Sequence, residues 1–167
     1  SLNHQEYLLD YRNFIELNSD HHLQVLTLGQ YRPGLMGPYD YFHVGGTNSI
    51  RSYTLNPVNY GQHEWLNTVE YRWDLFERVP MVFWDDNFYY GLQLVSGFDA
   101  ALMWRNDESD PYLLSSAYVG AHLLFPFVER VRVELGIGEL HEGPDRLIWG
   151  ITVGFFEKSF MQRERIR

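Results

Sequence analysis

Apolar and polar side chains alternate along most of this chain, and that period of two constrains its fold more than any other feature. The clearest example is the segment 62–76, where Val69, Tyr71 and Trp73 share one parity and Glu70 and Arg72 share the other. Successive side chains of a β-strand point to opposite faces, so the pattern predicts strands. The pattern recurs in the segments 7–17, 22–32, 62–76, 88–104, 113–125, 129–139 and 147–155. We therefore predict an all-β chain of about seven strands, many of them longer than the usual 5–6 residues.

Long alternating strands fit two architectures of opposite polarity. A soluble barrel or sandwich puts the apolar parity inside, whereas a transmembrane barrel turns it toward lipid and keeps polar side chains in the lumen. Charged residues in mid-strand, such as Glu70, Arg72 and Asp99, favour the second arrangement. So does the short turn at 18–20 followed by the long loop at 33–61. We expect an antiparallel transmembrane β-barrel, with a soluble barrel-type binding module as the alternative.

Composition narrows the possible functions. Aromatic residues make up 17% of the chain, which suits strands and a belt at a membrane interface, and we assign that role to the tryptophans Trp65, Trp73, Trp84, Trp104 and Trp149. The net charge of -9 argues against a broad nucleic-acid surface. The absence of cysteine removes disulfides, thiolate zinc sites and cysteine nucleophiles. No zinc-type histidine spacing and no catalytic or nucleotide-binding motif occurs, so we expect no enzyme activity, catalytic residue, metal or cofactor.

The long loop contains the stretch F-H-V-G-G-T-N-S-I-R-S-Y, residues 42–53. Structureless loops of this length are uncommon in compact domains unless they are functional or disordered. The lone Arg51 in this stretch needs an anion, and two carboxylates on later strands, Glu70 and Asp99, are candidates. Both lie on the polar parity of adjacent predicted strands, so both can face one guanidinium. The alternatives are an ordinary exposed arginine and three unrelated, solvated charges.

These residues, taken together, resemble the C-terminal half of the barrel in the BamA superfamily. Its members carry a loop pattern G-G-x-x-S-(V/I)-R-G-(F/Y), and the matching residues here are Gly45, Gly46, Ser49, Ile50, Arg51, Ser52 and Tyr53. Glu70 in V-E-Y-R and Asp99 in G-F-D-A-A-L-M-W match acidic positions on the two strands that follow. Gly120 with Pro126, and Gly154 with Phe155, continue the match in order. The resemblance covers nearly the whole chain.

The resemblance implies an outer-membrane barrel that inserts or translocates polypeptides, with Arg51 folded inward onto Glu70 and Asp99 as a loop lock. Expected partners are outer-membrane lipid, unfolded outer-membrane or secreted polypeptides, and accessory assembly subunits. The location is the outer membrane of a Gram-negative bacterium or of an organelle of bacterial origin. Some members use the same barrel to anchor a secreted patatin-like lipid hydrolase, which is the alternative function.

Three departures from the family pattern change details of this expectation. Ser52 stands where the family has Gly, which predicts a tighter or differently bent loop tip. Ala101 stands where a Gly often follows the aspartate. The chain also continues beyond its last predicted strand, so we expect the barrel portion at 1–156 and a polar tail at 157–167. About seven strands are too few for a membrane barrel, so we expect either further N-terminal strands or several chains to complete the wall.

Overall fold

The described part of the chain in this computed structural model is all β and antiparallel. It comprises residues 5–34, 41–44, 49–53, 60–83, 86–105, 110–124, 131–140 and 148–154, and contains no helix. The main sheet consists of β1 (Tyr7–Asn18), β2 (His21–Tyr31), β5 (His63–Phe83), β6 (Asp86–Trp104), β7 (Tyr112–Leu124), β8 (Val131–Gly138) and β9 (Ile148–Gly154). Two short strands, β3 (Phe42–His43) and β4 (Tyr60–Gly61), form a separate ladder in the long loop.

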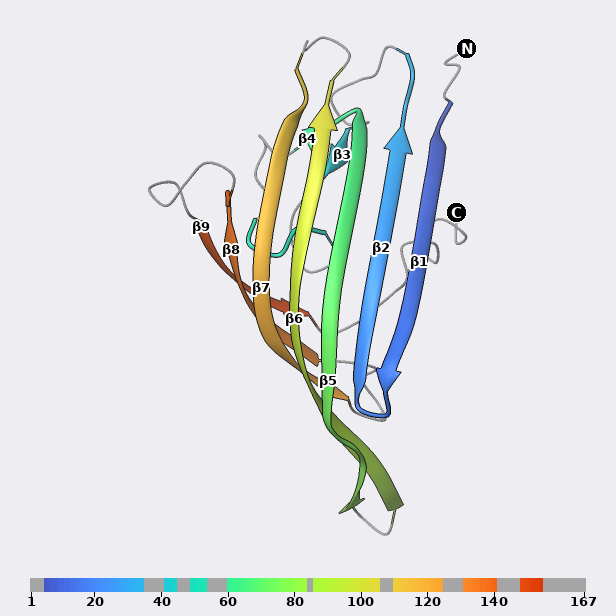
Figure 1. The fold of residues 1–167 in the computed structure, drawn as a ribbon, viewed down its shortest axis with the longest axis vertical. Coiled ribbons are helices and arrows are strands. Elements are labelled where there is room, and N and C mark those ends of the chain that lie inside the picture. The colour runs from blue at the N-terminus through green and yellow to red at the C-terminus, as the bar shows by residue number, and fades with distance from the viewer. Residues whose placement is uncertain are drawn as a thin grey trace.

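The seven strands of the main sheet follow one another in the order β1-β2-β5-β6-β7-β8-β9, each paired with its neighbour in sequence. Such a meander needs no crossover, and the described strands leave β1 and β9 as its two edges. The sheet is strongly curved: Figure 1 shows β8 and β9 turning away behind β6 and β7. The expectation of about seven antiparallel strands is confirmed. Closure of the sheet into a barrel does not occur among the described strands.

The hairpin formed by β5 and β6 is longer than the alternation predicts. We expected strands at 62–76 and 88–104, but β5 continues to Phe83 and β6 begins at Asp86, so the hairpin extends below the β1–β2 turn in Figure 1. The register shifts twice, between Asp74 and Phe76 and between Phe76 and Val79. Each β-bulge adds a residue to one strand and interrupts the period of two, which hid the continuation.

The two faces of the sheet have opposite polarity, and the apolar face is the outer one. On β5 the buried side chains include Glu64, Thr68 and Glu70, while Val69 and Trp73 are exposed, Trp73 by 41%. Cross-strand pairing carries this parity through the sheet, because directly paired residues share a face. Outside residues 74–93 of the β5–β6 hairpin, the outward positions are 7–17 odd, 21–31 odd, 63–73 odd, 94–104 even, 113–123 odd, 131–137 odd and 149–153 odd. None of them holds Asp, Glu, Lys or Arg.

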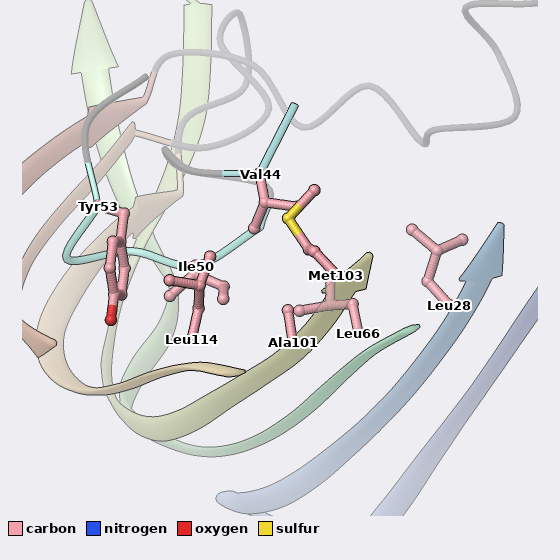
Figure 2. Close-up of a cluster of buried hydrophobic side chains, with 8 residues drawn as sticks. All are labelled: Leu28, Val44, Ile50, Tyr53, Leu66, Ala101, Met103 and Leu114. Carbon is pink, nitrogen blue, oxygen red and sulfur yellow. The ribbon is translucent and has the colours of Figure 1, made fainter. Parts of the chain in front are cut away.

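The described loop segments 41–44 and 49–53 pack on the inner face, where they contribute to a small hydrophobic cluster. Figure 2 shows Val44, Ile50 and Tyr53 of the loop facing side chains that rise from the strands beneath. The strand members of the cluster are Leu28, Leu66, Ala101, Met103 and Leu114. Val44 and Ile50 are completely buried, and full burial of such a side chain stabilises by about 1.5–3 kcal/mol. Ala101, a departure from the family pattern, adds its methyl group to this cluster.

Candidate functional site

The structure brings the three residues of the predicted loop lock into contact. Arg51 donates from Nη1 to Asp99 Oδ1 at 2.9 Å and from Nη2 to Glu70 Oε2 at 2.8 Å. Its backbone N–H also points to Asp99 Oδ2, at 3.3 Å. Glu70 on β5 and Asp99 on β6 face inward, and their side chains are almost completely buried. One guanidinium of the loop therefore bridges two neighbouring strands through charge-assisted hydrogen bonds.

A third carboxylate, Glu134 on β8, joins the cluster. Its Oε2 lies 2.9 Å from Arg51 Nε, close enough for an ion pair, but the Nε–H is not aligned for a hydrogen bond to it. The other carboxylate oxygen, Oε1, lies 2.8 Å from His122 Nε2 on β7. Both residues are fully buried. Glu134 lies in the predicted strand 129–139, but the sequence gives no sign of its contact with Arg51.

Tyr118 on β7 covers the guanidinium. Its ring centre lies 3.8 Å from Arg51 Cζ, the geometry of a cation–π contact. Its hydroxyl donates to Glu70 Oε2 at 2.7 Å, the same oxygen that accepts from Arg51. Tyr118 was not among the predicted site residues, and its one signal in the sequence is an aromatic side chain between Ser116 and Gly120 on the same parity.

The two predicted carboxylates have further donors of their own. Thr68 donates its hydroxyl to Asp99 Oδ1 at 2.8 Å. Arg72 donates from Nε to Glu70 Oε1 at 2.5 Å and reaches Gln24 on β2 with its Nη2. Buried carboxylates are tolerated when their oxygens are satisfied in this way. The network thus extends from β2 to β8 across the inner face.

The groups around Arg51 stabilise the charged form of its guanidinium. Burial by itself lowers the pKa of the guanidinium, but the opposing effects of Asp99, Tyr118, Glu70 and Glu134 outweigh it and raise the pKa above its ordinary value. An arginine is already charged at every physiological pH. The ion pairs therefore do not depend on the protonation of Arg51.

The backbone of the loop lies directly on two glycines of the last strands. A Cβ atom added at Gly150 on β9 would lie 2.7 Å from Ser52 O, and one added at Gly136 on β8 would lie 3.1 Å from Ser52 Cβ. Thr152 on β9 donates its hydroxyl to Arg51 O at 2.7 Å. Ser52 therefore fits here because the two residues opposite it, Gly136 and Gly150, have no side chains.

Tyr53 fixes the loop segment 49–53 to β7 and to the chain beyond β8. Its hydroxyl donates to Ser115 O at 3.4 Å and accepts from the backbone N–H of Glu139 at 2.9 Å. Glu139 has a positive φ of 58°, an uncommon conformation for this residue type. Of the other loop-motif residues, Ser49, Ile50 and Ser52 are buried on the inner face. Gly45 and Gly46 lie outside the described residues, as does the tail 157–167.

The contacts of the site hold residues 49–53 of the loop against the inner face of the sheet. Among the described residues, no group of three or more His, Asp or Glu side chains is placed to hold a metal ion. Within the same residues, no helix is long and apolar enough to cross a membrane. Compared with known proteins, the chain matches no family model, no curated protein and no solved structure.

Proposed function

We propose that this chain forms part of the wall of a transmembrane β-barrel in the outer membrane, with its long loop locked on the lumen side by Arg51. The barrel inserts or translocates other polypeptides, as the resemblance to the BamA superfamily implies. Its partners are outer-membrane lipid, unfolded outer-membrane or secreted polypeptides, and accessory assembly subunits. No covalent step and no cofactor is involved in this function.

The observation that carries the proposal is the inverted polarity of the sheet. Large apolar side chains such as Phe98 and Trp149 are 45% and 74% exposed on the outer face, while Glu70, Asp99 and Glu134 are buried on the inner one. Monomeric soluble proteins rarely expose apolar patches of more than a few hundred Å². An outer face without formal charge at the outward positions of the sheet outside residues 74–93 is the surface that a hydrocarbon solvent requires. A soluble barrel with its apolar parity inside has the opposite arrangement.

Polypeptide insertion is supported by the two edges of the described sheet. The strands β1 and β9 present unpaired backbone groups at the edges of the described sheet, and such edges can template an incoming strand. Seven antiparallel strands also leave β1 and β9 running in the same direction. An all-antiparallel wall therefore needs an odd number of further strands between them, supplied by other parts of the polypeptide or by other chains.

Two arginine substitutions matched for exposure test the lipid-facing surface. Phe98 and Tyr31 both point outward and are 45% and 46% exposed, but Phe98 lies in mid-strand and Tyr31 at a strand end. In a bilayer, Phe98→Arg should cost about 2–4 kcal/mol of folding free energy and Tyr31→Arg about 0–1 kcal/mol. Denaturant titration of the native polypeptide folded into vesicles measures both. Equal, small costs would contradict a lipid-facing wall.

Insertion of a client tests the function itself. A urea-unfolded eight-stranded outer-membrane protein is added to vesicles that contain the native polypeptide, and folded client is measured by its altered mobility in unheated gels. Arg51→Ala should slow client folding, whereas Arg12→Ala, which removes an inner-face arginine paired with Asp10 outside the lock, should not. Equal rates with and without the protein would refute an insertion function. Release of fatty acid from the vesicles would instead identify the barrel as the anchor of a lipid hydrolase.

A further inference from the structure

One line of three inner-face residues places a tyrosine directly over the loop lock. Glu70 on β5 pairs with Gly97 on β6, and Gly97 pairs with Tyr118 on β7. Because Gly97 has no side chain, the Tyr118 ring can lie flat across β6 and reach the carboxylate two strands away. A Cβ atom added at Gly97 would lie 2.2 Å from the Tyr118 hydroxyl oxygen and 2.4 Å from Cζ of the ring. No other residue type at position 97 leaves room for this arrangement.

The tyrosine contributes two separable interactions. The hydroxyl donates to Glu70 Oε2 at 2.7 Å, and this oxygen also accepts from Arg51 Nη2 at 2.8 Å. The ring face covers the guanidinium at 3.8 Å from Cζ. The first interaction fixes the orientation of the carboxylate, and the second excludes water from one side of the arginine. Charged hydrogen bonds are stronger where water is excluded.

Tyr118 does not belong to the hydrophobic cluster under the loop. That cluster includes Ile50, Leu66 and Leu114, whereas Tyr118 is 3% exposed among the charged groups of the lock. A tyrosine packed only for apolar area would not need its hydroxyl at a carboxylate already held by two arginines, Arg51 and Arg72.

We infer that Tyr118 is a positioning residue of the loop lock: its hydroxyl orients Glu70 toward Arg51 and its ring shields the guanidinium, in a space that Gly97 leaves open. This inference rests on the contacts of the inner face and holds whether or not the outer face lies in lipid. Its failure is therefore distinguishable from failure of the proposed function.

The test uses Tyr118→Phe, which removes the hydroxyl, and Tyr118→Leu, which removes hydroxyl and ring. Hydrogen exchange of the amides at 49–53 is compared with exchange of the amides in β2, in the wild-type background and in Arg51→Ala. Tyr118→Phe should accelerate loop exchange about tenfold, the usual effect of losing a hydrogen bond to a charged group, and Tyr118→Leu should accelerate it more. Neither should add anything in the Arg51→Ala background. Tyr112→Phe, a half-buried tyrosine of the same strand that contacts Met103 Sδ, is the matched control and should leave exchange unchanged.

Two further results decide whether Tyr118 positions the lock or merely fills space. The ring face should shift the guanidinium proton resonances of Arg51 upfield, and this shift should survive in Tyr118→Phe and vanish in Tyr118→Leu. A residue that only fills space would accelerate exchange in β2 as much as in the loop, and equally in both backgrounds. That result, or equal effects of Tyr118→Phe and Tyr112→Phe, would overturn the inference. If Tyr118→Leu fails to fold, the Phe variant and the Arg51→Ala comparison still decide the question.

Discussion

Removing the side chain of Arg51 is the most informative perturbation of this molecule. The guanidinium lies within 2.9 Å of carboxylate oxygens on β5, β6 and β8, and the backbone carbonyl of Arg51 accepts from the Thr152 hydroxyl on β9. Arg51→Ala deletes the ion pairs at once but leaves every strand-to-strand ladder intact. We therefore expect the loop to detach while the sheet remains folded.

The size of the effect follows from the hydrogen-bond partners that the three carboxylates keep when Arg51 is removed. Removing one partner of a buried ion pair costs about 3–5 kcal/mol, largely because an uncompensated charge stays behind. Here Asp99 keeps its bond from Thr68, Glu70 keeps Arg72 and Tyr118, and Glu134 keeps His122. The cost therefore belongs at the lower end, about 3 kcal/mol, which corresponds to a roughly hundredfold shift of the loop-docking equilibrium.

Hydrogen exchange of the loop amides reads this equilibrium directly, because exchange proceeds through local opening. Exchange of residues 49–53 should accelerate roughly a hundredfold in Arg51→Ala, while exchange in β2 and β6 changes little. Arg12→Ala serves as the control, because Arg12 faces the same side of the sheet and pairs with Asp10 in an exposed position outside the lock. Unchanged loop exchange in Arg51→Ala, or equal acceleration in the loop and in the strands, would refute the reasoning.

Three further substitutions probe how the loop is seated. Arg51→Lys should accelerate loop exchange nearly as much as Arg51→Ala, because one ammonium cannot match the planar fork that reaches several carboxylates. Gly150→Ala should displace the loop, since the added Cβ would meet Ser52 O at 2.7 Å, and increased cleavage of the loop by added protease would report it. Gly29→Ala, next to the Trp65 ring on the outer face, is its control and should leave cleavage unchanged. Thr152→Val removes one hydrogen bond to Arg51 O and should accelerate loop exchange by about fivefold, corresponding to about 1 kcal/mol; no acceleration would mean that this bond does not hold the loop.

The fold was largely predictable because strand periodicity is a local property of the sequence. Alternation places Val69 and Glu70 on opposite faces whatever the rest of the chain does, and it also identifies Glu70 and Asp99 as neighbours on one face. The prediction failed at the β5–β6 hairpin for the same reason. Beyond Asp74 the bulges leave Leu75 and Phe76 both exposed, so that the period of two is lost while the strand continues.

The contacts of Glu134 and Tyr118 with Arg51 could not be predicted because they depend on the curvature and the register of the sheet. Glu134 lies on β8, two strands away from Asp99, and reaches Arg51 only because the sheet curls around the loop. The position of Tyr118 depends on the register that puts Gly97 beside it. The alternation of side chains within one strand determines neither the curvature of the sheet nor the register of its pairing. Both depend on how the strands pair along the whole sheet.

The central claim is that the outer face of the sheet contacts lipid, and two adjacent residues of β6 test it most directly. The chain has no cysteine, so Gln93→Cys and Leu94→Cys each accept a single nitroxide label. Gln93 is buried on the inner face, and Leu94 is exposed on the outer one. In vesicles holding the native polypeptide, the label at 94 should be relaxed by oxygen, which concentrates in lipid, and the label at 93 by a water-soluble nickel complex. Relaxation of the label at 94 by the nickel complex rather than by oxygen would contradict the account.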